Sequence, residues 1–456
     1  MPKKKTSFTF IHTADLHLGR NISIGDKSSS NIDSRYFRLK DELIKRAFQA
    51  PLTALKNLVS VAIENNVDFI VIAGDVFDKH INSGEFYKEF HKRLAELSRN
   101  QIRVYITLGN HDRIKYLPGE SNLLSDFKNE KLPKGVYVFD DKVSESFEDD
   151  LCNVIVHGQS FEKQHVHDPL VKNFPKKKNN FFNIGVIHTD CKGSNPNDPD
   201  RNPYAPTSQT LLAPLKYDYW AFGHIHLRST PIESMPEVVY SGNPQGLNTK
   251  PAEMNEKGCV MVSVNDGEFK HSFVELDDAR FLEIKLSVTA KDKWGELKSK
   301  VMDKCSDIEW ENNSILNLIK LKITGNNSEV KRIIASSIES KNLIRETSSD
   351  NLQVIQIDTQ ELKGEDVQSS FGIIEELSNQ YATLEKQELL DLIFDEASKE
   401  LEKEHQENFK AGSKETFLAE TTSSKDSNDE YEDLVKTAKT VAENILNGIP
   451  YGGESL

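Results

Sequence analysis

Short runs of apolar residues alternate with amphipathic stretches over about the first 265 residues of the chain. The amphipathic stretches repeat apolar residues at helical spacing, as at Leu52, Leu55 and Leu58 and again at Phe90 and Leu94. Five apolar runs have the length and composition of buried strands, namely residues 8–13, 69–73, 104–108, 184–188 and 219–222. The alternation predicts β-α-β organisation, and therefore an α/β domain built on a largely buried sheet.

From about Phe281 the pattern changes to alternating apolar and polar positions, which suits strands with one face in water. Leu282–Leu286, Leu316–Ile323 and Ile355–Ile357 follow this pattern, with helical stretches between them. Further on, one stretch has the composition of a flexible linker. We therefore expect a large domain over 1–275, a smaller α+β domain over 276–364, an acidic helical segment over 365–418, a linker over 419–430 and a C-terminal amphipathic helix within 431–456.

The last helical stretch carries one apolar stripe on an otherwise charged surface. The stripe consists of Tyr431, Leu434, Val435, Ala438, Val441, Ala442 and Ile445. A stripe of this kind needs a surface to cover it. The helix can fold back onto its own domain, or it can dock on a partner protein that the linker lets it reach. Both interpretations stay open at this point.

The formal net charge of -15 is concentrated near the end of the chain. Residues 365–456 hold 22 acidic and 8 basic residues, which leaves 50 acidic and 49 basic residues for everything before them. The near-neutral front part can therefore carry local basic patches, so the overall acidity does not exclude a protein that binds nucleic acid.

The cysteines and the N-terminus indicate the compartment. Cys152, Cys191, Cys259 and Cys305 are widely scattered, with no pair at C-x-x-C spacing, which suits a reducing compartment and packing thiols. The first apolar run is too short for a signal peptide, and no stretch approaches membrane-spanning length. No G-x-x-x-x-G-K-[ST] loop occurs, so we do not expect the chain itself to bind ATP. We expect a soluble cytoplasmic protein with no membrane contact.

Residue types that bind metal ions follow the predicted strands repeatedly. In chain order they are Asp15, His17, Asp75, Asn110, His111, Asp112, His188, His224 and His226. Loops at the carboxyl ends of strands in open α/β sheets converge on one crevice, so these residues can meet there. A single H-x-H pair would be weak support for a metal site, whereas five such loops in this order are strong support.

The donor types indicate the metal and its chemistry. Aspartate oxygen together with imidazole nitrogen suits Mn²⁺, Fe²⁺ or Zn²⁺, whereas Ca²⁺ would require nearly all oxygen. Two such ions close together form a clamp for in-line displacement at phosphorus. The loops therefore predict a phosphoryl-transfer site with two divalent ions.

This order of motifs resembles the calcineurin-like metallophosphoesterases, whose pattern is D-x-H, G-D, G-N-H-D, H and G-H-x-H. The resemblance covers roughly residues 8–265. Segments 11–19 (IHTADLHLG), 73–78 (AGDVFD) and 240–246 (YSGNPQG) look like the DNA repair nuclease branch of the family, represented by bacterial SbcD and YhaO-type exonuclease subunits. The resemblance implies a metallophosphoesterase β-sandwich flanked by helices, with a smaller α+β capping domain and a helical C-terminal region.

The resemblance also implies a role for each site residue. It assigns one ion to Asp15, His17, Asp75 and His226, and the other to Asp75, Asn110, His188 and His224. Asp75 would bridge the two ions. His111 would stay free of metal near the scissile phosphate, where it can protonate the leaving oxygen or stabilise developing charge. Asp112 would orient His111.

Other polar residues near these motifs have simpler interpretations. His12 lies beside Asp15 in sequence, but strand alternation should turn it to a different face. His157 ends an apolar run, and a hydrogen-bonded structural histidine is the favoured interpretation. Asp78 and Asp190 are expected to be loop caps or groups that support the ligands.

Three functions are consistent with these motifs. The favoured one is a DNA nuclease, exonucleolytic, endonucleolytic or both, working with a coiled-coil SMC-like ATPase of the SbcC/YhaN type. We expect Mn²⁺ as its metal and a homodimer as its oligomeric state. The alternative is a small-molecule phosphodiesterase or phosphatase acting on nucleotides. A binding module without activity is disfavoured, because every ligand position holds a competent residue. About 190 residues beyond the catalytic part favour a polymer substrate and a partner.

Overall fold

The structure is a computed structural model that describes residues 4–20, 22, 41–78, 84–113, 132–191, 204–232, 237–311, 313–335 and 337–364. The predicted acidic helical segment, linker and C-terminal helix (365–456) lie outside these residues. The chain divides into two compact units. In the described part of the chain, the first unit contains residues within 4–284, 304–321 and 348–356, and the second contains residues within 285–303, 322–347 and 357–364.

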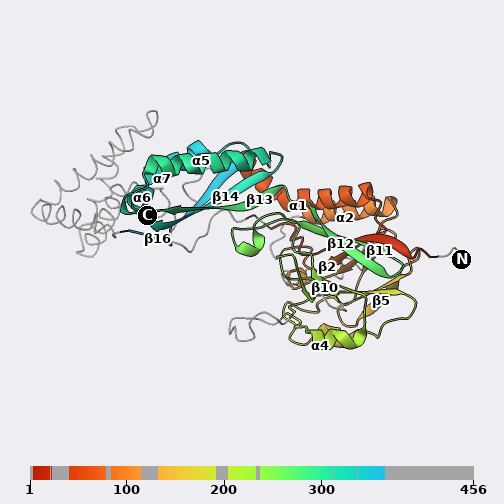
Figure 1. Cartoon of the computed structure of the whole chain (residues 1–456). Coiled ribbons are helices and arrows are strands. Elements are labelled where there is room, and N and C mark those ends of the chain that lie inside the picture. Colours follow the sequence, from red (N-terminus) through yellow and green to blue (C-terminus); the bar gives the residue numbers. More distant parts are fainter. Residues whose placement is uncertain are drawn as a thin grey trace, which may run out of the picture. The chain divides into compact units, whose positions relative to one another are not determined.

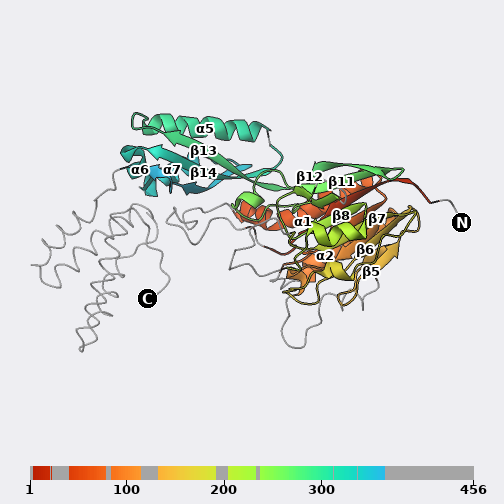
Figure 2. The same ribbon diagram turned by 60° about the horizontal axis from the view of Figure 1, so that its bottom comes forward.

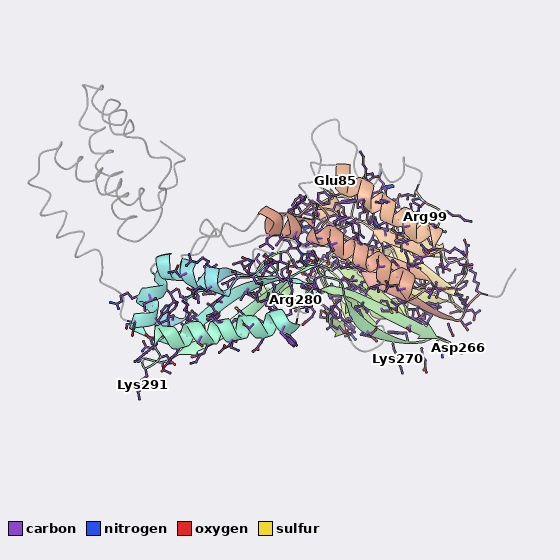
Figure 3. All side chains as sticks on the ribbon, turned by 90° about the horizontal axis from the view of Figure 1, so that it is seen from above. Glu85, Arg99, Asp266, Lys270, Arg280 and Lys291 are labelled. Carbon is purple, nitrogen blue, oxygen red and sulfur yellow. The ribbon has the colours of Figure 1, made fainter. Side chains whose placement is uncertain are left out.

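The first unit contains two six-stranded sheets. The first sheet has the order β12-β11-β1-β2-β3-β4, with bounds Glu268–Glu275, Gly258–Asn265, Ser7–Thr13, Phe69–Ala73, Arg103–Thr107 and Val136–Val138. Strands β1 to β4 run parallel, whereas β11 is antiparallel to both β1 and β12. Asp266 and Gly267 both have positive φ in the two-residue turn between β11 and β12, as a type I′ hairpin requires. Figure 3 shows Asp266 and Lys270 at this end of the hairpin.

The second sheet has a parallel centre and two antiparallel edges, whereas the first sheet is antiparallel at one edge only. Its order is β5-β6-β7-β8-β10-β9, with bounds Glu145–Glu148, Val154–Gly158, Phe182–His188, Tyr219–Gly223, Glu237–Tyr240 and Ser229–Ile232. Strands β6, β7, β8 and β10 are parallel, and β5 and β9 pair antiparallel at the two edges. Figure 2 shows β5 to β8 side by side.

Alternating side chains of the parallel strands form the cores on the two faces of the first sheet. Phe10 and Val71 belong to the core that the two sheets enclose, and Phe10 stacks on Phe69 at 4.9 Å between ring centroids. Ile11 and Ile70 point to the opposite face, where they pack with the helices α1 (Asp41–Glu64) and α2 (Gly84–Arg99). Figure 1 shows these two helices over that sheet, and Figure 3 marks the ends of α2 by Glu85 and Arg99.

The sandwich of sheets flanked by helices confirms the predicted α/β fold class. The five predicted strands all occur, with shifts of at most two residues at their ends. They divide between the sheets, because β1, β2 and β3 lie in the first and β7 and β8 in the second. Periodicity alone does not reveal this division, because strands buried on both faces look alike in sequence.

The strands predicted after residue 280 form a four-stranded sheet. Its order is β13-β14-β15, with β16 paired to β14, and the bounds are Ala279–Val288, Leu316–Asn326, Leu352–Asp358 and Leu362–Lys363. The intervening helices are α5 (Trp294–Glu311), α6 (Ser328–Ala335) and α7 (Ser337–Thr347). No helix in the described part of the chain is long and apolar enough to cross a membrane.

Candidate metal centre

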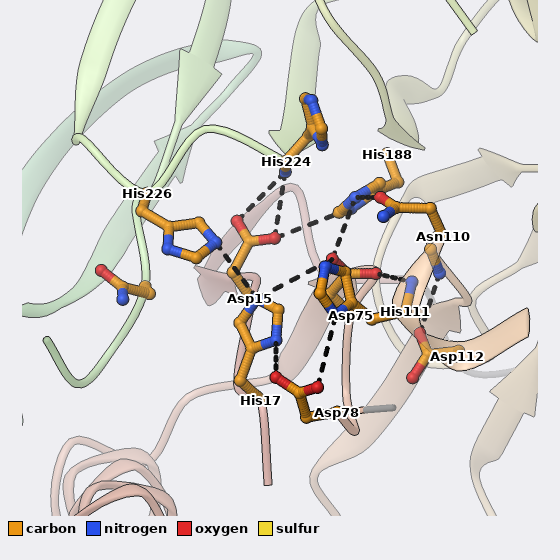
Figure 4. Close-up of polar contacts among 12 residues, drawn as sticks. Asp15, His17, Asp75, Asp78, Asn110, His111, Asp112, His188, His224 and His226 are labelled. Atoms are coloured by element: carbon orange, nitrogen blue, oxygen red, sulfur yellow. Dashed lines mark hydrogen bonds and ion pairs between the residues drawn. The ribbon is translucent and has the colours of Figure 1, made fainter. Parts of the chain in front are cut away.

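The predicted ligands come together at the carboxyl ends of strands from both sheets. Asp15, His17, Asp75 and Asn110 follow strands of the first sheet, whereas His188, His224 and His226 end or follow strands of the second. Figure 4 shows these residues in one close group, at the edge of which the ring of His224 lies while its backbone N–H faces Asp15. The two sheets of the sandwich therefore contribute to one site.

The backbone at four of these positions adopts a conformation that side chains rarely take. The φ angles are 55° at Asp15, 44° at His17, 50° at Asp75 and 100° at His224. Left-handed backbone at a residue other than glycine costs about 1–3 kcal/mol and persists only where the surroundings enforce it. Such residues cluster at functional sites, and here they turn the donors towards one another.

Two glycines leave space for the donors to approach. Gly74 has a φ of +88°, and a Cβ atom there would lie 2.5 Å from Nδ1 of His188. A Cβ atom at Gly109 would collide with a carboxylate oxygen of Asp75. The glycines of the G-D and G-N motifs are therefore required by close packing around His188 and Asp75.

The first set of donors consists of Asp15, His17 and His226, whose ligand atoms lie within 4.8 Å of one another. Nδ1 of His226 donates to Oε1 of Glu253 at 2.6 Å, so its Nε2 carries a lone pair. Nδ1 of His17 lies 3.5 Å from Oδ2 of Asp78, which favours the same tautomer. The two Nε2 atoms face each other at 3.1 Å. A proton or a metal ion must lie between two nitrogens this close, so this set can hold a metal ion.

The second set consists of Asp75, Asn110 and His188. Nδ1 of His188 lies 3.0 Å from the carbonyl oxygen of Ala73 and donates to it, which leaves Nε2 to carry either a proton or a metal ion. This Nε2 lies 3.0 Å from Oδ1 of Asn110 and 3.4 Å from Oδ2 of Asp75. Two oxygens therefore face Nε2, where a metal ion can take the place of the imidazolium proton, and this set also fits a metal ion. His224 packs its ring against His188, with ring centroids 5.2 Å apart.

The two buried aspartates make the site favourable for positive charge. Burial lowers the pKa of His188, but the carboxylate of Asp75 outweighs this effect, and the pKa is raised to about 9. Burial raises the pKa of Asp75, yet the charge of His188 lowers it well below its usual range. Burial raises the pKa of Asp15. Its two oxygens accept the backbone N–H of His224, each at 3.1 Å. The ionised Asp75 therefore stabilises a cation where the two donor sets meet.

His111 lies beside the two sets and is partly open to solvent. Its side chain is 19% exposed, and its backbone N–H donates to Oδ1 of Asp75 at 2.9 Å. Oδ1 of Asp78 lies 3.6 Å from Nδ1 of His111, while Oδ2 of the same carboxylate lies 3.2 Å from the guanidinium of Arg20. One buried carboxylate thus contacts His111, a cationic side chain and, through the same Oδ2, the predicted ligand His17.

Asp112 has a different environment from the one expected. Its oxygens accept backbone N–H groups of Val76, Phe77 and Gly109 at 3.2, 2.9 and 2.8 Å. Burial and the neighbouring Asp75 raise the pKa of Asp112 to about 7. We expected Asp112 to orient His111, whereas the carboxylate that the structure gives beside Nδ1 of His111 is that of Asp78.

Two groups at the site escaped the sequence analysis. Glu253 bonds to His226 although 27 residues separate them, and no spacing rule indicates that pair. Tyr204 packs its ring against His224 with centroids 4.6 Å apart, and it follows a part of the chain with no clear pattern. For Asp78, the G-D-x-x-D spacing from Gly74 was the available signal.

His12 and His157 have structural surroundings. His12 is fully buried between the hydroxyl of Tyr219 at 3.0 Å and the carbonyl oxygen of Phe222 at 3.2 Å. His157 is bonded to Ser146 at 2.7 Å and to Asn183 at 3.1 Å. The structure therefore places neither histidine among the metal-ligand clusters found in the described residues.

Comparison with known proteins agrees with this geometry. Residues 8–228 match the calcineurin-like phosphoesterase family. The chain is 29% identical over 293 residues to the uncharacterized metallophosphoesterase YhaO of Bacillus subtilis. This alignment covers 62% of this chain and 64% of YhaO. It therefore spans slightly less than two thirds of that relative.

Two further similarities extend the comparison. The DNA double-strand break repair protein Mre11 of Methanocaldococcus jannaschii is 25% identical over 308 residues, covering 65% of this chain and 74% of Mre11. A dimetal phosphatase from Danio rerio aligns with 59% of this chain and 99% of its own at 12% identity, with a TM-score of only 0.34. The family match and the converging donors confirm the resemblance read from the motif order: residues 8–228 form a calcineurin-like metallophosphoesterase domain.

Proposed function

We propose that this protein is a metal-dependent DNA nuclease that hydrolyses phosphodiester bonds with two Mn²⁺ ions. The observation that carries the proposal is the pair of donor sets in which atoms that can bind metal face one another on either side of Asp75. Mixed carboxylate, amide and imidazole donors suit Mn²⁺, and the same donors can also bind Fe²⁺ or Zn²⁺.

The chain's own residues divide between the two ions. Asp15, His17, Asp75 and His226 would hold one, and Asp75, Asn110, His188 and His224 would hold the other. Bound ions of this kind supply Lewis acidity, because they neutralise the charge of a phosphate and lower the pKa of water. The two carboxylates leave the loaded site with a net positive charge, which attracts an anionic phosphodiester.

His111 would supply the proton that the departing oxygen needs. Its ring is partly exposed and lies beside the first set, with its centroid 4.7 Å from that of His17. When Nδ1 donates to Asp78, Nε2 is the atom that can face the substrate. A positioned acid of this kind contributes roughly two to four orders of magnitude in rate.

Similarity to a repair protein supports DNA as the substrate. The alignment with Mre11 extends over 308 residues, which is longer than the matched catalytic family. The alternative is a small-molecule phosphodiesterase acting on nucleotides, which needs little beyond the catalytic domain. The four-stranded sheet and its helices after residue 278 favour a substrate that must be positioned over a larger surface.

The test is cleavage of linear DNA by the full chain with Mn²⁺ and with excess EDTA, with Asp75→Ala purified in parallel as the control for contaminating nucleases. We expect cleavage with Mn²⁺, none with EDTA, and affinity for DNA that falls steeply as salt rises. Full activity in EDTA, in protein shown to be free of metal, contradicts the two-metal site. Rapid hydrolysis of a cyclic nucleotide together with a flat salt response favours the alternative.

We also propose the partners that the family resemblance implied, a coiled-coil SMC-like ATPase and a second copy of the chain. The proposed tether is the apolar stripe within 431–456. Deleting residues 425–456 should leave metal-dependent nuclease activity intact and abolish co-purification with the ATPase. Unchanged association, or loss of folding, assigns the helix to another role. Sedimentation of the isolated chain tests the homodimer.

A further inference from the structure

We propose that Glu253 is a positioning residue, which holds the imidazole of His226 in the orientation and tautomer that a metal ligand requires. The inference deepens the proposed function and rests on it, because His226 is taken as a ligand of one of the two ions. Glu253 lies in a short 3-10 helix (Pro251–Glu253) that is outside the motifs of the family pattern.

The contact between the two side chains is short and buried. Oε1 of Glu253 accepts from Nδ1 of His226 at 2.6 Å, and Glu253 is only 6% exposed. A hydrogen bond to a carboxylate is about twice as strong as one between neutral groups. Because this bond places the ring proton on Nδ1, the lone pair of Nε2 is directed towards His17 and the first donor set.

The second oxygen of Glu253 is fixed by other groups. Oε2 accepts from Nδ2 of Asn243 at 2.7 Å and from the backbone N–H of Leu247 at 3.1 Å. With both oxygens engaged, the carboxylate cannot rotate without losing a bond. A rigid acceptor of this kind fixes the plane of the imidazole as well as its tautomer.

A buried lysine fixes the backbone of the same histidine. Lys257 is 4% exposed, and its amine donates to the carbonyl oxygen of His226 at 2.9 Å and also to that of Ala252. Its charge is opposite to that of Glu253, and each group stabilises the charged form of the other. His226 is therefore held at its ring by a buried anion and at its backbone by a buried cation.

The segment 240–246 gains a physical role from this arrangement. Asn243 binds Glu253, and a Cβ atom at Gly246 would collide with the carbonyl oxygen of Glu253. Gly242 has a φ of +72°, and a Cβ atom there would lie 2.8 Å from the carbonyl oxygen of His226. The sequence Y-S-G-N-P-Q-G is thus built around the pair Glu253 and His226, although none of its own residues belongs to the donor sets.

Gln245 of the same segment provides a matched control. Its Oε1 accepts the backbone N–H groups of Asp278 and Ala279 at 3.0 and 3.2 Å, and its amide donates to the carbonyl oxygen of Ala279. These bonds anchor the segment without touching Glu253 or His226. Gln245→Ala should therefore weaken the fold locally without changing one metal site selectively.

The experiment is a calorimetric titration of the full-length, metal-free protein with Mn²⁺, together with electron paramagnetic resonance to detect the spin-coupled ion pair. Loss of a group that orients a ligand lowers metal affinity roughly 10- to 100-fold. We expect Glu253→Ala to weaken one ion by this factor and to leave the other within about twofold. Because the amide oxygen of Glu253→Gln is a weaker acceptor than a carboxylate, that variant should weaken the same ion several-fold.

The selective loss is what a merely structural role would not produce. Equal Mn²⁺ affinities in the wild-type protein and in a folded Glu253→Ala variant overturn the proposal. The proposal is also overturned if Glu253→Ala weakens the binding of both ions equally, as Gln245→Ala does. If Glu253→Ala does not fold, an unchanged titration of Glu253→Gln overturns it. A wild-type protein that binds two ions but cleaves no DNA removes the nuclease proposal, while the titration still decides the role of Glu253.

Discussion

The carboxylate of Asp78 lies 3.6 Å from Nδ1 of His111, and it is the acid that the structure gives beside this ring nitrogen. Its other oxygen lies 3.2 Å from the guanidinium of Arg20. Burial raises the pKa of Asp78, but the neighbouring imidazoles of His111 and His17 and the charge of Arg20 lower it well below its usual range. The carboxylate is therefore ionised and can stabilise an imidazolium at His111.

This relationship predicts that Asp78→Asn lowers turnover of DNA roughly 10- to 100-fold at saturating Mn²⁺, because an amide stabilises the imidazolium less than a carboxylate does. The measurement is kcat on a linear duplex. In a His111→Ala background the same substitution should have little further effect, since residues that act as a unit are not additive. Full additivity of the two losses would mean that Asp78 acts through His17 instead.

His111→Ala should separate chemistry from binding. We expect Mn²⁺ affinity and DNA affinity close to those of the wild-type protein, with turnover lower by roughly two to four orders of magnitude. Metal titration and equilibrium DNA binding with Ca²⁺ in place of Mn²⁺ provide the two controls. Loss of an ion in the titration would make His111 a ligand.

Asp112→Ala should act mainly on stability. Three buried N–H groups would lose their acceptor, and each unsatisfied group costs roughly 1–3 kcal/mol. We expect the free energy of unfolding to fall by about 3 kcal/mol in urea, measured on metal-free protein. Asp150→Ala, at an exposed position, is the matched control and should change it by less than about 0.5 kcal/mol.

The different surroundings of Asp78 and Asp112 explain how far sequence reasoning reached. Strand-end loops identified the residues that converge, because the carboxyl ends of parallel strands lie at one edge. The partner of His111 was not identified, because Asp112 is its neighbour in the chain while Asp78 is its neighbour in space. A residue next to a strand end can accept backbone N–H groups as easily as it can reach a side chain.

Glu253 shows a second limit of prediction from the sequence. The contact with His226 depends on the turn around Gly242 and on the short helix that ends at Glu253, and neither has a periodic signature. The fold was more accessible, because β2 coincides with its predicted range of 69–73 and its side chains are all buried. Periodic burial can be recognised from the spacing of apolar residues in a sequence, whereas single long-range contacts between polar side chains cannot.

Asp75→Ala should be the most damaging change to metal binding. Oδ2 of Asp75 lies 3.4 Å from Nε2 of His188 and 3.8 Å from Nε2 of His17, one donor from each set. A shared carboxylate contributes to both ions, so we expect both affinities to fall at least tenfold and DNA cleavage to disappear. Elemental analysis of the protein after gel filtration in Mn²⁺ provides the measurement. Two ions per chain in this variant would contradict the bridging assignment.

The last prediction concerns His157, which lies away from the metal-ligand clusters of the described residues. Burial lowers its pKa to about 4, although the hydrogen bond with Asn183 raises it. The unfolded chain, with an ordinary histidine pKa of about 6.5, binds a proton that the folded protein excludes until pH falls to about 4. The neutral histidine's contribution to stability is therefore fully present above about pH 6.5 and is lost as pH falls between these two values.

Replacing His157 by Gln removes this titration and keeps a side chain that can bond to Ser146 and Asn183. We expect the free energy of unfolding of the wild-type protein, relative to the His157→Gln variant, to fall by about 2 kcal/mol between pH 7 and pH 5. Urea unfolding of both metal-free proteins at the two pH values provides the measurement, and the comparison cancels the titration of the metal ligands because both proteins share them. A difference between the two proteins that stays constant with pH would mean that His157 titrates alike in the folded and unfolded chains, which contradicts the burial argument.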